Sequence, residues 1–301
     1  MKPKTPKFSA EDIVDCGIDS IRFVMPKATL NGFLKKIELL GRLRLISRNK
    51  TVKDYAEYKL KGANKPLFDA DEKHPCKIRY ISFKRGTKSL SNTMLVVENS
   101  SELNDLCKKR KKPFGYYVCV VFAGLFQPSR DIYKETYRIL GKFLRRFKPY
   151  SWDVAVDFKD RGEINHKAKG KFKEHVKECA DDVISFKTSI YANRGLKSGK
   201  FYAVDKVCFY DKFEKQTNYH KQKIDEKFKD WKRLEVTFRL KGKFMDFIEN
   251  ENFKECVEVM DEIADKLTGE FPFGVYLGKF NEQIAYFRDM RKRLNLSKTI
   301  F

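Results

Sequence analysis

The chain has 301 residues, enough for one large domain or two ordinary ones with a real hydrophobic core. A hydrophobic fraction of 42% and an aromatic fraction of 14% exclude wholesale disorder, although 35% of the residues are charged. Lys and Arg number 64 against 41 Asp and Glu, which gives a formal net charge of +23 spread along the chain. Such a surface favours a polyanionic partner, either nucleic acid or an anionic membrane, and the alternative is that the charge only reflects a generally Lys-rich proteome.

Hydropathy and cysteine usage indicate a cytoplasmic protein. No apolar run approaches the roughly 20 residues of a membrane span, and no apolar segment follows the basic residues 1–7 as a secretory signal requires. The seven cysteines are scattered without a Cys-x-x-Cys pair, which predicts reduced thiols and argues against a structural zinc site. The four histidines are dispersed and form no His-hydrophobic-His pair.

The first half of the chain predicts an arm over 1–17, a strand over 18–24 and a helix over 29–43. Short alternating segments then predict further strands at 43–46, 55–60, 78–83 and 93–97, with a polar loop over 61–75. A short helix is expected at 101–106. It runs into five consecutive cations, 108–112, which are typical of a solvated surface loop.

The second half begins with an apolar strand over 116–122 and a helix over 129–147, capped by Ser129. One face of this helix is apolar and the other is basic. Strands are predicted at 150–158, 183–191, 200–210 and 231–240, with a polar segment over 159–182, a turn at Gly195 and Gly199, and a charged helix over 213–228. Residues 241–301 predict a C-terminal helical region.

This order of elements predicts an α+β fold with an antiparallel sheet. We expect one domain over 18–240. Within it, residues 18–97 and 116–240 each run strand, helix and then several strands, which is compatible with two ferredoxin-like halves.

Acidic residues recur on one face of two predicted strands. Asp153 and Asp157 share a strand face, two turns of the pleat apart, and carboxylates that point the same way can bind or flank a divalent cation. Glu235 shares its strand face with Arg233. The alternative is that these residues form cross-strand salt bridges on an exposed sheet face.

A tyrosine and a lysine accompany these carboxylates, because Tyr210 and Lys212 lie on the same face of their strand. This set suits metal-assisted phosphodiester transesterification, in which a tyrosyl oxygen attacks the phosphate and leaves a covalent phosphotyrosyl intermediate. A cationic lysine would stabilise the charge that develops on the phosphate or on the phenolate.

The segment order over roughly 90–240 resembles the replication initiation factors of rolling-circle plasmids and filamentous-type phages, and related conjugative relaxases. The matching motifs are Ser151-Trp152-Asp153-Val154-Ala155-Val156-Asp157, Gly199-Lys200-Phe201-Tyr202, Val207-Cys208-Phe209-Tyr210-Asp211-Lys212 and Arg233-Leu234-Glu235-Val236. The chain departs from the family where Ser151-Trp152 stands in place of a frequent arginine. It also has no His-hydrophobic-His motif, which leaves the identity of the ion open.

The resemblance implies a Rep nuclease-type fold and an enzyme that nicks and rejoins one DNA strand at a replication origin. Asp153, Asp157 and Glu235 would be metal or phosphate-site carboxylates, with Mg²⁺ or Mn²⁺ as the ion. Tyr210 is the preferred nucleophile, with Lys212 beside it. Tyr219, with Lys223 one helical turn on, is the rival nucleophile, and Tyr191 and Tyr202 are weaker candidates.

Such an enzyme would bind origin DNA, either single-stranded or as a melted duplex, and a host helicase. The candidate phosphate contacts are Lys108, Lys109, Arg110, Lys111, Lys112, Arg138, Lys142, Arg145, Arg146 and Arg233, with Lys134, Arg288, Arg291, Lys292 and Arg293 in addition. Each alone is typical of a solvated face. The alternative function is a non-catalytic nucleic-acid-binding protein on the same fold, and a membrane-surface role ranks third.

Overall fold

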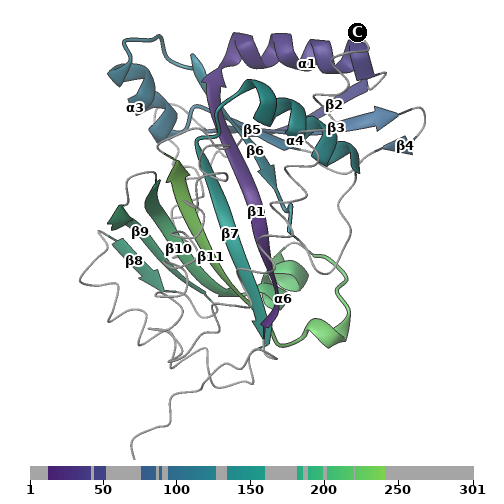
Figure 1. Cartoon of the computed structure of the whole chain (residues 1–301), viewed down its shortest axis with the longest axis vertical. Helices are drawn as coiled ribbons and strands as arrows, with labels where there is room; N and C mark the ends of the chain where they lie inside the picture. The colour runs from purple at the N-terminus through teal and green to yellow at the C-terminus, as the bar shows by residue number, and fades with distance from the viewer. Residues whose placement is uncertain are drawn as a thin grey trace, which may run out of the picture. The chain divides into compact units, whose positions relative to one another are not determined.

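The computed structural model describes residues 13–41, 44–51, 76–85, 88–89, 94–126, 134–159, 182–185, 189–198, 202–219 and 221–240 (Figure 1). The predictions for 55–60, for 61–75, for most of 159–182 and for 241–301 lie outside these residues. The described elements confirm an α+β fold with antiparallel strand pairing. No helix in the described ranges is long and apolar enough to cross a membrane.

The chain divides into two compact units. Unit 1 contains residues 1–19, 125–131 and 151–301, and unit 2 contains residues 20–124 and 132–150. These units do not coincide with the two expected halves, because the strand at 117–123 and the helix at 134–146 belong with the N-terminal elements.

Unit 2 is built on an antiparallel sheet. Its strands are β1 (Ile13–Pro26, from residue 20 on), β2 (Arg44–Thr51), β3 (Lys77–Arg85), β4 (Lys88–Ser89), β5 (Met94–Glu98) and β6 (Tyr117–Ala123). The strand order is β2-β3-β5-β6-β1, with β4 beside β3. Because β1 begins at Ile13, part of the predicted N-terminal arm is in fact strand.

Helices pack on both faces of this sheet. Successive side chains of β6 point to opposite faces, so this strand contacts helices on each face. The helices of unit 2 are α1 (Lys27–Gly41), α3 (Ser101–Lys109) and α4 (Lys134–Arg146). Phe122 of β6 contacts Phe143 of α4, with ring centroids 5.1 Å apart, and Phe143 also contacts Phe33 of α1 at 4.9 Å. Cys119 of β6 instead packs in a cluster with Leu103 of α3. The apolar face predicted for the helix at 129–147 is therefore confirmed from residue 134 on.

Unit 1 contains a second run of antiparallel strands. They are β7 (Ser151–Lys159), β8 (Asp182–Ser185), β9 (Ser189–Ser198), β10 (Tyr202–Asp211) and β11 (Trp231–Leu240). The order is β7-β11-β10-β9-β8, and the first part of β1, through Asp19, also belongs to this unit. The single strand predicted at 183–191 is two strands, and β9 continues through Gly195 where a turn was expected.

One face of the β7-β11-β10 segment is apolar. It carries Trp152, Val154, Val156, Val207, Phe209, Leu234, Val236 and Phe238, all of which are buried. Trp152 and Phe238 face each other in the register, with ring centroids 6.4 Å apart. Polar side chains occupy the other face of the same three strands.

The connection from β10 to β11 is not the single charged helix predicted at 213–228. It contains the short α6 (Lys212–Glu214), a π-helical turn η2 (Lys215–Tyr219) and a 3₁₀ turn η3 (Glu226–Phe228). Asp211 caps α6, and Asp225 caps η3 by accepting a hydrogen bond from the Lys227 amide. Lys221 lies between these two turns and has a φ of 54°. This is a left-handed conformation, which interrupts a right-handed helix. The capping aspartates and this left-handed residue divide the segment into short turns.

Candidate active site

The strand register brings polar residues of β7, β11 and β10 into rows across one sheet face. In one row Tyr210 is opposite Arg233, and Arg233 is opposite Asp157. In the next row Glu235 lies between Cys208 and Ala155. Because the side chains on either side of Glu235 are small, its carboxylate has room to reach the Tyr210 hydroxyl in the neighbouring row.

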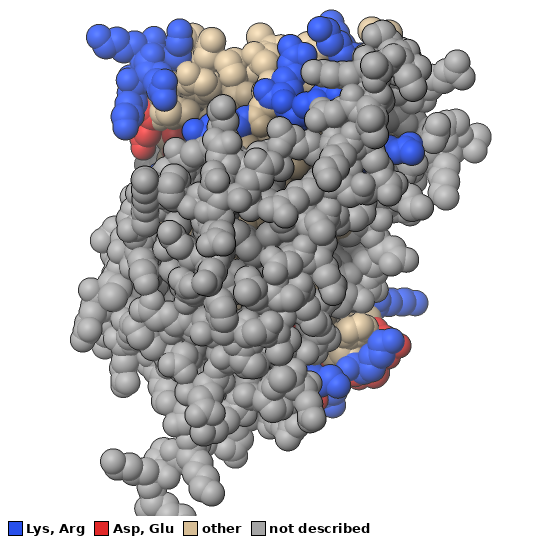
Figure 2. Space-filling view, in the orientation of Figure 1, with Lys and Arg blue, Asp and Glu red and all other residues tan. Residues whose placement is uncertain are grey.

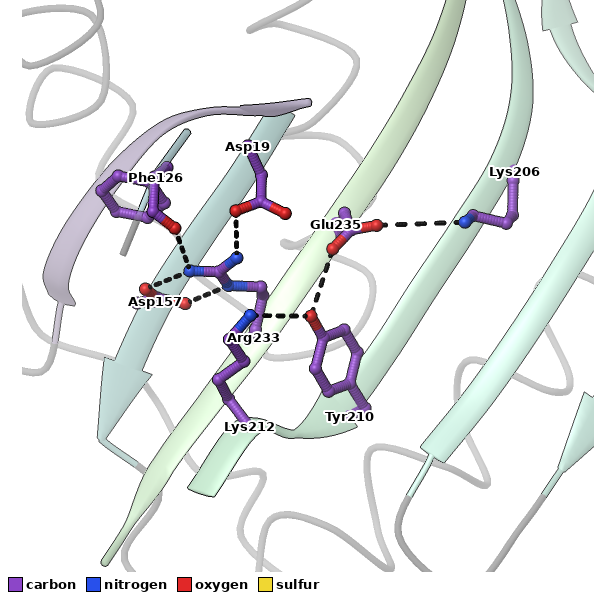
Figure 3. Close-up of polar contacts among 8 residues, drawn as sticks. All are labelled: Asp19, Phe126, Asp157, Lys206, Tyr210, Lys212, Arg233 and Glu235. Atoms are coloured by element: carbon purple, nitrogen blue, oxygen red, sulfur yellow. Dashed lines mark hydrogen bonds and ion pairs between the residues drawn. The ribbon is translucent and has the colours of Figure 1, made fainter. Parts of the chain in front are cut away.

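Tyr210 is held between a carboxylate and an ammonium group (Figure 3). Its hydroxyl donates a hydrogen bond to Oε2 of Glu235 over 3.1 Å, and its oxygen accepts one from Nζ of Lys212 over 3.4 Å. Nζ of Lys215 lies 4.1 Å from the centre of the Tyr210 ring. The arrangement can remove a proton from the hydroxyl and stabilise the resulting phenolate oxygen.

Lys206 joins this group from β10. Its Nζ lies 3.9 Å from Oε1 of Glu235, so the carboxylate faces the tyrosine on one side and a cation on the other. Sequence reasoning missed Lys206, although strand alternation places it on the same face as Cys208 and Tyr210.

Arg233 lies at the centre of a buried ion-pair network. Its guanidinium makes two contacts with Asp157, Nε to Oδ1 at 2.6 Å and Nη2 to Oδ2 at 2.8 Å. Nη1 lies 2.9 Å from Oδ1 of Asp19, and Nη2 also donates to the Phe126 carbonyl oxygen at 3.2 Å. The guanidinium therefore pairs with two carboxylates from two other strands.

This network corrects the prediction that Arg233 contacts DNA phosphate. The side chain is 0% exposed and its nitrogens already face protein oxygens, so a phosphate on the surface does not reach it. Sequence reasoning also missed Asp19 and the Phe126 carbonyl as its partners. The available signal for Asp19 was an acidic residue between Ile18 and Ile21 in a predicted strand.

Burial sets the protonation of the site. It raises the pKa of Tyr210 well above its ordinary value, and the neighbouring Glu235 carboxylate raises it further, so the phenol is protonated at neutral pH. Burial, followed by the positive charge of Arg233, lowers the pKa of Lys212 to about 8. Burial also raises the pKa of Asp157, and the adjacent Arg233 guanidinium opposes that rise.

The three carboxylates predicted as metal ligands do not form a common ligand set. Both oxygens of Asp157 face Arg233, and Oδ1 of Asp153 accepts a hydrogen bond from Thr237 over 2.7 Å. Over the described ranges, no three His, Cys, Asp or Glu residues are grouped so as to hold a metal ion. These residues therefore do not fit the predicted metal site. Dependence on Mg²⁺ or Mn²⁺ stays a prediction.

The predicted basic residues of unit 2 are mostly on the surface. Lys108 through Lys112 are exposed, although the first two end α3 and do not lie in a loop. On α4, Arg138, Arg145 and Arg146 are exposed, while Lys142 is half-buried, and burial lowers its pKa. Tyr219 lies in η2, but its side chain, like those of Tyr191 and Tyr202, is outside the described part of the structure. The terminal cations 288–293 are outside it as well.

Replacing Lys212 with Met is expected to stabilise the protein near pH 7. A charged lysine whose pKa falls from 10.5 to about 8 destabilises the folded state by roughly 3 kcal/mol, and Met removes that charge. Since the unfolded chain keeps the proton up to a higher pH, wild-type stability recovers as pH rises from about 8 toward 10.5. Urea unfolding at pH 7 and pH 9.5 should therefore show a gain that shrinks at the higher pH. A destabilised Lys212→Met variant at pH 7 would contradict this electrostatic account.

Comparisons with known proteins add little to this geometry. Neither a scan against protein-family models nor a search of curated proteins finds a match. Among solved structures, the chain is similar to the structure of a rolling circle replication initiator protein from Geobacillus stearothermophilus, with 14% identity over 75% of each chain and a TM-score of 0.27. At that TM-score the likeness carries no argument about the activity of this chain.

Proposed function

We propose that this protein is a DNA replication initiator that nicks and rejoins one strand at an origin through a phosphotyrosyl intermediate. The observation that carries the proposal is the Tyr210 hydroxyl held between Glu235 and Lys212. A tyrosine in this setting has a base for its proton and a cation for its developing charge. The motifs shared with rolling-circle initiation factors, and the net charge of +23, support DNA as the substrate.

In the proposed reaction, Glu235 accepts the proton of the Tyr210 hydroxyl as the phenolic oxygen attacks a phosphodiester. The bond between phosphorus and the tyrosyl oxygen forms, and the bond between phosphorus and one sugar oxygen breaks. That sugar oxygen leaves as a hydroxyl after taking up a proton, and cationic Lys212 stabilises the phenolate during the transfer. Rejoining is the reverse reaction, with a strand hydroxyl as the attacking group.

Access to the tyrosine is part of this proposal. Tyr210 is 2% exposed, so the single strand must open the face that covers it before a phosphate reaches the hydroxyl. Glu235, at 8%, is the most exposed of the predicted site carboxylates and the one beside the nucleophile. No step is assigned to a metal ion, although we propose that cleavage depends on Mg²⁺ or Mn²⁺.

The remaining parts of the proposal follow from the family resemblance. We propose a degenerate Rep nuclease fold with ferredoxin-like halves, action in the cytoplasm, and a host helicase that unwinds the nicked duplex. The second candidate is a non-catalytic nucleic-acid-binding protein. The exposed cations of unit 2 and the burial of Tyr210 favour it.

A covalent-adduct assay separates the two functions. The protein is incubated with a pool of randomised single-stranded oligonucleotides in Mg²⁺ or Mn²⁺, and adducts are separated on a denaturing gel. The initiator predicts a DNA-linked band that EDTA prevents. Salt-sensitive binding without an adduct in either metal, unchanged by Glu235→Gln, would identify the binding protein instead.

The rate of adduct formation is expected to fall as pH rises through about 8. Below this pH Lys212 is cationic, and above it the lysine loses the charge that stabilises the phenolate. Initial rates measured from pH 6.5 to 9.5 test this. Lys212→Arg is the matched control, because an arginine stays cationic over the whole range. A wild-type rate that keeps rising above pH 8 would show that Lys212 does not act as a cation.

A further inference from the structure

We infer that the turn formed by residues 108–116 is a binding site for single-stranded DNA, in which Phe114 stacks on an unpaired base and the preceding cations hold phosphates. The site lies in unit 2, whereas the proposed active site lies in unit 1. Only the choice of DNA as the polymer rests on the proposed function.

The first part of this turn is a fixed helix terminus. The Lys112 amide donates to the Cys107 carbonyl over 2.8 Å, and the Lys111 amide donates to the Lys108 carbonyl over 3.1 Å. Lys111 itself is left-handed, with φ of 52°. This pair of bonds around a left-handed residue is the Schellman ending of a helix, where glycine is usual. A lysine there is unfavourable in backbone conformation, so this chain has a cation at a position that favours glycine.

The second part is a tight turn that projects an aromatic ring. The Tyr116 amide donates to the Pro113 carbonyl over 3.1 Å, and Gly115 supplies the positive φ of 72° that this turn requires. Phe114, at the tip, is 49% exposed. The backbone on both sides of Phe114 is thus fixed by hydrogen bonds, which limits the entropy lost when a base stacks on the exposed part of its ring.

Charge on this turn favours a polyanion. All five residues from Lys108 to Lys112 are exposed, and Figure 2 shows Lys and Arg gathered at the upper left, where Figure 1 places α3. On α3 itself, Glu102 and Asp105 are acidic and exposed. Asp105 pairs with Lys108 at 3.6 Å, and both side chains are mostly exposed, so the pair neutralises little of the patch.

The composition of this turn favours nucleic acid over a membrane as its partner. Among the described residues, the large hydrophobic side chains that are exposed are Phe114 and Leu39, and Leu39 belongs to α1. A membrane-binding surface needs a broad apolar face, whereas a single strand needs one ring for each base and cations for its phosphates. The turn has the second composition.

Fluorescence anisotropy with a labelled oligothymidylate of about 20 nucleotides tests the site in the full chain. Phe114→Ala is expected to weaken binding roughly 5- to 150-fold, since stacking on one base is worth about 1–3 kcal/mol. Phe114→Trp should retain the affinity, and its indole fluorescence should be quenched on binding. Lys109→Gln and Lys112→Gln should each reduce the slope of log affinity against log salt by about 0.7, the value for one phosphate contact to a single strand.

Controls separate base stacking at this turn from a loss of folding and from lipid binding. Phe114→Ala should leave duplex binding and thermal unfolding unchanged, because a half-exposed ring at a turn tip contributes little to the core. Unchanged affinity of Phe114→Ala for the single strand would overturn the inference. The inference would also be overturned if Phe114→Ala lost binding to anionic phosphatidylserine vesicles but kept its affinity for DNA. An adduct at Tyr210 tests the proposed function separately, because either result can hold without the other.

Discussion

Tyr210→Phe is expected to reduce adduct formation by at least about 10³-fold, because it removes the attacking oxygen. The variant keeps the ring that packs beside Lys215, and it loses only the hydrogen bonds to Glu235 and Lys212. The fold should therefore survive while the chemistry stops. Quantitative denaturing gels of adduct against time, with circular dichroism to check folding, give the measurement.

The rival nucleophile supplies the matched control for this experiment. Tyr219→Phe should leave the adduct unchanged if Tyr210 attacks. Glu235→Gln should slow the wild-type reaction by roughly 10²- to 10⁴-fold, as expected for the loss of a general base. If Tyr219→Phe stops the reaction and Tyr210→Phe does not, the roles of the two tyrosines are exchanged.

Arg233→Met is expected to lower the free energy of unfolding by about 3–5 kcal/mol. The substitution leaves Asp157, which is 0% exposed, and the partly buried Asp19 without their shared cation. Removing one partner from a buried ion pair has this cost because an uncompensated charge stays in a low-dielectric interior. Urea unfolding monitored by tryptophan fluorescence measures the loss, since Trp152 and Trp231 are both buried in this unit.

A surface ion pair on the same strand provides the comparison. Arg239 bonds Asp205 at 2.9 Å, but its side chain is 44% exposed, so Arg239→Met should cost no more than about 1 kcal/mol. If Arg233→Met and Arg239→Met lowered the free energy of unfolding equally, the buried network would contribute no more to stability than the surface ion pair.

Strands with strict alternation could be predicted from the sequence. Residues 150–158 and 231–240 each place large apolar side chains on one face, such as Trp152 and Phe238, and both segments form strands within one residue of the expected bounds. The connection at 213–228 could not be predicted in this way. Its helical spacing is overridden by local capping at Asp211 and Asp225 and by the left-handed Lys221.

The partners of the site residues depended on tertiary structure. Alternation put Tyr210 and Glu235 on faces of their own strands, but only the pairing of β10 with β11 brings the two side chains to 3.1 Å. Arg233 had the same sequence signal as a surface cation, and its burial against Asp157 and Asp19 decides its role. Sequence periodicity gives the direction of a side chain. The depth of that side chain comes from the packing of distant segments.

Mass spectrometry of the proteolysed DNA adduct is the most direct test of the central claim that Tyr210 is the nucleophile. After nuclease digestion, a peptide containing Tyr210 should carry the added mass of a nucleotide phosphate, and fragmentation should place it on that residue. A nucleotide on Tyr219, or on any other residue, would contradict the account.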